Sequence, residues 1–209
     1  MNTYLAIPSS SVRGGILVLH AWWGLNPFIK TLCDRFAGEG FVALAPDLFH
    51  GHVASEVKEA EKLRSQARRE AVTGEIMAGL DALQAIPQLK GHRIGSVGFS
   101  YGAYWGLWLA EEKPDTLAAT VFFYGTRNGE YPNTRSAFLG HFAETDTYVA
   151  ASGVKRLEKN LKAAGKDVYF YTYPGTGHWF FENDREAYNP GAAELAWRRT
   201  LGFLQRSLG

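Results

Sequence analysis

Three residues that lie far apart in the sequence, Ser100, Asp146 and His178, have the side chains needed for nucleophilic hydrolysis. A serine hydroxyl is a weak nucleophile at neutral pH and needs an adjacent histidine to take its proton. A carboxylate in turn orients that histidine and stabilises the imidazolium form. If folding brings the three together, they form a site for acyl-transfer chemistry.

Ser100 is the centre of a Gly98-x-Ser100-x-Gly102 motif, which follows a short apolar run that starts at residue 93. Bulky residues then recur at helical spacing up to residue 110, so the stretch 93–110 predicts a strand that turns directly into a helix. On such a corner the serine side chain projects outward, and a Cβ at either flanking glycine would clash with neighbouring backbone. The alternative is that the serine only caps the helix, as serine often does.

The other two residues each follow a predicted strand. Asp146 comes just after the apolar stretch 137–142, and His178 follows the stretch 168–173 in a glycine-rich segment. Because the carboxyl ends of parallel strands share one edge of a sheet, we expect these side chains to meet Ser100 there.

Less specific roles exist for both residues. Asp146 could cap the helix that starts near Thr147, and His178 could be a surface or core histidine. Glu144 and Asp184 are alternative carboxylates, although Asp184 comes after the histidine. The order serine, aspartate, histidine favours Asp146.

The rest of the chain alternates between apolar strands and amphipathic helices without internal repeats. The predicted strands are 15–20, 41–45, 93–99, 118–124, 137–142 and 168–173, and the predicted helices include 27–39, 55–86, 149–164 and 192–208, with a break or bend expected at Gly74. Nearly continuous apolar strands that alternate with helices indicate a parallel sheet covered on both faces. We predict one domain over residues 1–209.

Composition limits the classes of function. The 209 residues are 46% hydrophobic and 21% charged with a net charge of +1, so nothing draws the chain to nucleic acid or anionic lipid. No apolar run is long enough to span a membrane and no signal peptide is visible, so we expect a cytoplasmic protein. The single cysteine, Cys33, excludes an internal disulfide framework, and we expect it to be buried and inert. The sequence does not predict the oligomeric state.

The motifs resemble those of the dienelactone hydrolase family, a lidless branch of the α/β-hydrolases, over about residues 13–206. The resemblance lies in Leu19-His20-Ala21-Trp22-Trp23-Gly24-Leu25-Asn26, Ala45-Pro46-Asp47-Leu48, Val97-Gly98-Phe99-Ser100-Tyr101-Gly102-Ala103, Tyr124-Gly125, Gly140-His141-Phe142-Ala143-x-x-Asp146 and Tyr173-x-Gly175-x-Gly177-His178. It implies an α/β-hydrolase fold without a large lid domain and a carboxylic ester or lactone as substrate.

Some residues depart from the family pattern. The namesake enzymes have cysteine where this chain has Ser100, and a glutamate that helps to form the thiolate where Ala21 stands. Losing both together is consistent with a serine esterase triad. The namesake enzymes also hold a substrate carboxylate with an arginine at the position of Glu182 and a second arginine near residues 57–61. Arg64, Arg68, Arg69 or Arg127 could substitute, but each also fits a solvated surface charge, so these departures argue against an anionic dienelactone as substrate.

We therefore predict a serine hydrolase in which Ser100 attacks, His178 moves the proton and Asp146 orients His178, through an acyl-enzyme intermediate. The backbone N–H groups of Trp22 and Tyr101 are the expected oxyanion hole. The predicted substrate pocket is formed by aromatic residues next to the catalytic loops: Trp23, Tyr124, Trp179 and Phe180.

No metal and no organic cofactor is expected, because His20, His50 and His52 share no ligand spacing with an acidic residue or cysteine. Asp47, at a strand end, is expected to anchor its turn. Trp108 and Trp197 are expected to be core residues. Two alternatives remain open: a thioesterase or acyltransferase that uses the same triad, and a ligand-binding module with vestigial catalysis.

Overall fold

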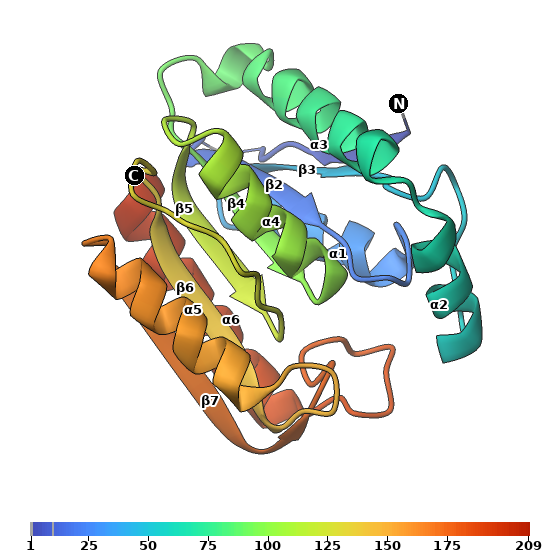
Figure 1. Cartoon of the computed structure of the whole chain (residues 1–209). Coiled ribbons are helices and arrows are strands. Elements are labelled where there is room, and N and C mark those ends of the chain that lie inside the picture. The colour runs from blue at the N-terminus through green and yellow to red at the C-terminus, as the bar shows by residue number, and fades with distance from the viewer. Residues whose placement is uncertain (1, 10) are drawn as a thin grey trace.

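A computed structural model describes residues 2–9 and 11–209. Seven strands form one sheet in the order β1-β3-β2-β4-β5-β6-β7 (Figure 1). The strands are β1 (Thr3–Ala6), β2 (Gly14–Leu19), β3 (Phe41–Pro46), β4 (Ile94–Phe99), β5 (Leu117–Phe123), β6 (Ala137–Thr145) and β7 (Val168–Gly177). All neighbouring strands pair in parallel except β1, which is antiparallel to β3.

Helices cover both faces of the sheet, which confirms the predicted fold class. They are α1 (Pro27–Gly38), α2 (Val57–Gln66), α3 (Arg69–Gln84), α4 (Tyr101–Glu112), α5 (Ala151–Ala163) and α6 (Pro190–Leu208), with a 3₁₀ turn at Pro87–Leu89. Helices α1 and α6 lie on one face of the sheet, and α3, α4 and α5 lie on the other (Figure 1).

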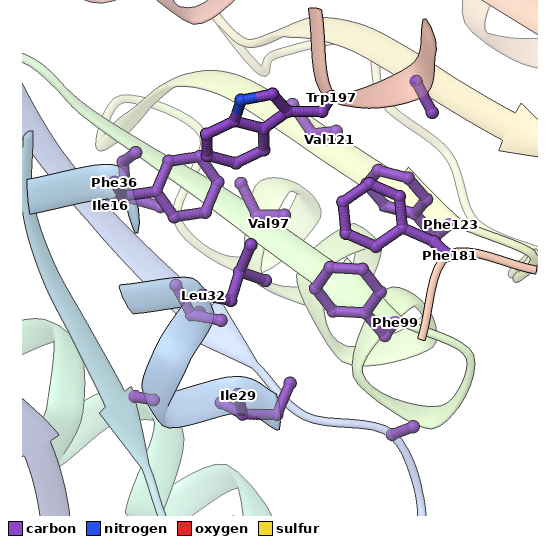
Figure 2. Close-up of a cluster of buried hydrophobic side chains, with 14 of the residues drawn as sticks. Ile16, Ile29, Leu32, Phe36, Val97, Phe99, Val121, Phe123, Phe181 and Trp197 are labelled. Carbon is purple, nitrogen blue, oxygen red and sulfur yellow. The ribbon is translucent and has the colours of Figure 1, made fainter. Parts of the chain in front are cut away.

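The two cores follow from the alternation of side chains along a strand. In β2, Ile16 and Val18 belong to the core under α1 and α6, whereas Leu17 and Leu19 belong to the opposite core. Figure 2 shows the first core, where Phe36 of α1 lies against Trp197 of α6 with ring centroids 4.9 Å apart. Because both faces of the inner strands are covered, nearly every residue of β2, β3 and β4 is buried.

Two expectations about the elements need correction. The chain breaks between α2 and α3, where Ala67 and Arg68 adopt extended backbone, and not at Gly74. Gly74 lies inside α3 because Val72, Ile76 and Leu80 are buried on one side of that helix, and their packing outweighs the roughly 1 kcal/mol penalty of a helical glycine. The edge strand β1, of four residues, was not predicted.

The structure gives structural positions to the four residues for which they were expected: Cys33, Asp47, Trp108 and Trp197. Cys33 is fully buried, and burial raises the pKa of its thiol to about 12, which keeps it in the unreactive protonated form. Trp108 and Trp197 are buried in opposite cores. Asp47 accepts a hydrogen bond from the backbone of Phe49 and so anchors the turn after β3. No helix among the described residues has the length and hydropathy to cross a membrane.

Candidate active site

Ser100 lies on the sharp corner between β4 and α4. Its backbone has φ 48° and ψ −104°, a conformation that costs a non-glycine residue about 1–3 kcal/mol. A Cβ on Gly98 would lie 2.6 Å from the carbonyl carbon of Gly102, and a Cβ on Gly102 would lie 2.6 Å from the oxygen of His20. Both positions therefore require glycine, because α4 starts in direct contact with the end of β2.

The Ser100 hydroxyl does not cap the helix. Its Oγ lies 2.9 Å from Nε2 of His178, and Nδ1 of His178 lies 2.8 Å from Oδ2 of Asp146. The three side chains, from the ends of β4, β6 and β7, therefore form one continuous chain of hydrogen bonds. The His178 and Asp146 side chains are only 4% and 7% exposed, so water competes little with the contact between them.

The second carboxylate oxygen explains the other role considered for Asp146. Oδ1 accepts hydrogen bonds from the backbone amides of Tyr148 and Val149, at 2.8 and 2.9 Å. One side chain thus holds the turn after β6 and orients His178. With Nδ1–H donated to Asp146, the Nε2 lone pair of His178 faces the Ser100 hydroxyl.

The two alternative carboxylates are engaged elsewhere. Glu144 accepts a hydrogen bond from the amide of Gly175 at 2.9 Å. Asp184 accepts from the side chain of Asn26 and pairs with Arg185.

The expected oxyanion donors are the backbone amides of Trp22 and Tyr101. Trp22 lies in the loop after β2, and Tyr101 is the first residue of α4, where an amide has no partner within the helix. Within residues 2–9 and 11–209, neither amide donates a hydrogen bond to a protein group. Both remain available, and the N-terminal end of α4 favours a negative charge.

A cavity of about 300 Å³ opens beside Ser100 and His178. Its walls are mostly aromatic, with one cation: Trp22, Arg64, Tyr101, Tyr104, Trp105, Tyr124, Gly125, Thr126, Tyr148 and Val149. A confined, mostly apolar cavity with few polar groups is typical of a site for a small organic ligand.

This wall differs from the predicted one. Of the four expected pocket residues only Tyr124 lines the cavity. Trp23 and Trp179 line a separate hollow near Arg185, which stacks over Trp23 at 4.0 Å, and Phe180 is fully buried. These residues were assigned to the wall because they flank the loops that carry Ser100, Asp146 and His178, but in a parallel α/β fold a loop residue can also point inward and extend the core.

The aromatic wall residues that the prediction missed come from two places. Tyr104 and Trp105 lie in the first turns of α4, four and five residues after Ser100, and Tyr148 follows Asp146 by two residues. Their proximity in sequence to the triad was a usable signal. Arg64 comes from α2, and no local signal connects it to the cavity. Of the other arginines considered, Arg127 pairs with Glu111.

Of the histidines considered as metal ligands, His20 has a clear structural role. His20 is fully buried, with Nδ1 2.6 Å from the oxygen of Ala21 and Nε2 accepting from the amide of Leu48. Burial lowers the pKa of His20 to about 4, so the ring is neutral and both nitrogens are used. Among the residues the structure describes, no three His, Cys, Asp or Glu side chains are grouped as a metal site requires.

Comparison with known proteins places the chain in a family. The model of the dienelactone hydrolase family matches residues 1–208. Protein usf of Aquifex pyrophilus is 34% identical over 98% of this chain and 93% of its own length. A protein of Aquifex aeolicus, named "putative carboxymethylenebutenolidase", is 30% identical over 98% of this chain and 93% of its own length.

Structural comparison agrees. The crystal structure of a dienelactone hydrolase-like promiscuous phosphotriesterase from metagenomic libraries superposes with a TM-score of 0.83, at 23% identity, over 96% of this chain and 89% of that one. At that identity the likeness shows the fold alone. The match to the family model extends over nearly the whole sequence, and the chain therefore belongs to the dienelactone hydrolase family of carboxylic ester hydrolases.

Proposed function

We propose that this protein is a serine hydrolase that cleaves small carboxylic esters or lactones through an acyl-enzyme intermediate. The observation that carries the proposal is the continuous contact from Ser100 through His178 to Asp146, at 2.9 and 2.8 Å, on the wall of an aromatic cavity.

In the first half-reaction Ser100 Oγ attacks the carbonyl carbon while Nε2 of His178 accepts its proton. Asp146 stabilises the imidazolium that forms. The amides of Trp22 and Tyr101 hold the oxyanion, and losing one such donor typically raises the barrier by about 2.7–4 kcal/mol. His178 then protonates the leaving alkoxide, which departs and leaves the acyl group on Ser100.

In the second half-reaction His178 takes a proton from the water that attacks the acyl-enzyme, and returns it to Ser100 Oγ as the bond to the acyl group breaks and the acid is released. A cavity of about 300 Å³ favours short or planar acyl groups over long chains. Arg64 is the one cation on the cavity wall, so esters with and without a carboxylate on the acyl group belong in the same substrate screen.

The test is labelling with a fluorophosphonate, followed by mass spectrometry of the labelled peptide. We expect one label on Ser100, with labelling and turnover of p-nitrophenyl esters both lost in Ser100→Ala. A protein with vestigial catalysis would take no label, and turnover that survives in Ser100→Ala would refute the proposed nucleophile.

Hydrolysis and acyl transfer can be separated in the same assay. If an added alcohol or amine captures the acyl group in preference to water, the protein is an acyltransferase on the same triad. Parallel assays with short thioesters and lactones identify the leaving group that the site prefers.

A further inference from the structure

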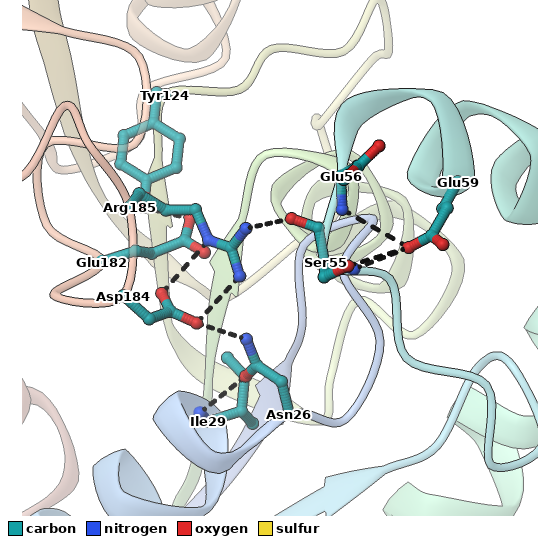
Figure 3. Close-up of polar contacts among 9 residues, drawn as sticks. All are labelled: Asn26, Ile29, Ser55, Glu56, Glu59, Tyr124, Glu182, Asp184 and Arg185. Atoms are coloured by element: carbon teal, nitrogen blue, oxygen red, sulfur yellow. Dashed lines mark hydrogen bonds and ion pairs between the residues drawn. The ribbon is translucent and has the colours of Figure 1, made fainter.

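Glu182 is a buried carboxyl group that the proposed chemistry does not use. It lies four residues after His178 on the same loop, and its side chain is 1% exposed. Its Oε1 accepts a hydrogen bond of 2.7 Å from the Tyr124 hydroxyl. Figure 3 shows this pair beside Asp184 and Arg185 of the same loop. Burying a carboxyl group costs free energy, so the presence of Glu182 next to the site needs an explanation.

Tyr124 connects Glu182 to the catalytic histidine. It is the first residue after β5, it is fully buried, and its ring lies 4.8 Å from the His178 ring, measured between centroids. Its backbone has φ 37°, which is strained for a tyrosine, and its amide donates to the oxygen of His141 at 2.7 Å. The neighbouring structure therefore holds this ring in one place, against the imidazole.

We propose that Tyr124 and Glu182 are a positioning pair for His178: the Glu182 carboxyl fixes the Tyr124 hydroxyl, and the Tyr124 ring packs against the imidazole. Asp146 holds the imidazole at Nδ1, so both contacts help to set the direction in which Nε2 points. The proposal rests on the proposed function, because it gives His178 the role of proton acceptor. Neither Tyr124 nor Glu182 exchanges a proton with the substrate.

The charge state of Glu182 determines which substitution preserves the contact. Burial, helped by the nearby carboxylate of Asp184, raises the pKa of the Glu182 carboxyl to about 8 against the opposing effects of the Tyr124 hydroxyl and Arg185. The other charged groups that act on Tyr124 are Asp184, on the same loop as Glu182, and Asp146, from the loop after β6. At pH 7 Glu182 is therefore mostly a neutral acceptor, and a glutamine reproduces both its shape and its carbonyl oxygen.

The experiment compares steady-state hydrolysis of p-nitrophenyl acetate at pH 7 by wild type, Glu182→Gln, Glu182→Met and Tyr124→Phe. We expect Glu182→Gln to keep kcat within about twofold of wild type. Glu182→Met and Tyr124→Phe should lower kcat by about tenfold or more with little change in KM, because a small displacement of a catalytic group slows proton transfer without weakening binding. Glu186→Gln is the matched control, since Glu186 is an exposed carboxyl on the same loop.

Three results would overturn the proposal: unchanged kcat in Tyr124→Phe, unchanged kcat in Glu182→Met, or a loss in Glu182→Gln as large as that in Glu182→Met. If Glu182→Met does not fold, as judged by circular dichroism, Tyr124→Phe decides the question, because it removes a single oxygen. Failure of the proposed function is distinguishable, since wild type would then take no fluorophosphonate label at Ser100 or Ser100→Ala would remain active.

Discussion

Glu182 should make the stability of this protein fall as the pH rises from about 4.5 to about 8. The pKa of a glutamate is 4.5 in its ordinary state, and burial raises it to about 8 here. The folded protein therefore holds this proton more tightly than the unfolded chain does. The stabilisation is fully present below pH 4.5 and is lost as the pH rises through about 8.

The magnitude follows from the same two values. The gap between 4.5 and about 8, at about 1.4 kcal/mol for each pH unit, corresponds to about 5 kcal/mol. Glu182 is fully buried, so solvent screening does not reduce this figure, although local rearrangement around the charge would. An effect of this size is a large fraction of the roughly 5–15 kcal/mol that stabilises a typical domain.

The assay is urea denaturation of wild type and Glu182→Gln at pH 5, 7 and 9, followed by the fluorescence of the six tryptophans. Every other titrating group is common to both proteins, so its contribution cancels in the difference. We expect the two free energies of unfolding to agree within about 1 kcal/mol at pH 5, and the variant to be more stable by about 3–5 kcal/mol at pH 9. A difference that does not change between pH 5 and pH 9 would refute the reasoning.

Three further predictions concern the site and the core. Asp146→Asn should lower kcat by about 10³–10⁴-fold in an ester assay, because an amide does not fix the tautomer of His178 or stabilise its charge; a loss below tenfold would contradict the assigned role. Gly102→Ala should give no folded protein by circular dichroism, since the new Cβ would lie 2.6 Å from the oxygen of His20, and a folded, active variant would count against this packing. Burial lowers the pKa of His141 to about 3, so its contribution to stability is lost as the pH falls from 6.5 towards 3. His141→Gln should therefore lose less free energy of unfolding than wild type between pH 7 and pH 4 in urea titrations, and an equal loss would show that His141 is not the group responsible.

The parallel sheet could be predicted from the sequence because the features that specify it are local patterns of residues. Gly98 and Gly102 around Ser100 are needed for any sharp strand-to-helix turn, and the apolar runs of β2, β3 and β4 reflect burial on both faces. Parallel pairing then places the loops after β4, β6 and β7 at one edge. The placement of Asp146 and His178 on these loops follows from topology alone.

The missed features depend on what packs against each element. Nothing in the sequence of α3 shows that the packing of its buried face outweighs the energetic penalty of Gly74. Nothing in residues 3–6 shows that β3 is available to pair with them. The break between α2 and α3 is likewise a consequence of where each helix docks.

The features of the site fall into the same two groups, those that the sequence predicts and those that depend on tertiary packing. The sequence by itself determined the chemical types of the three proposed catalytic residues, their order and the loops that carry them, because these depend on short motifs and on strand ends. Only the tertiary structure decided which aromatic side chains face the cavity, that Arg64 reaches its wall, and that Glu182 meets Tyr124 behind His178. The direction of a side chain on a loop is set by neighbours from distant parts of the chain, and no local pattern records them.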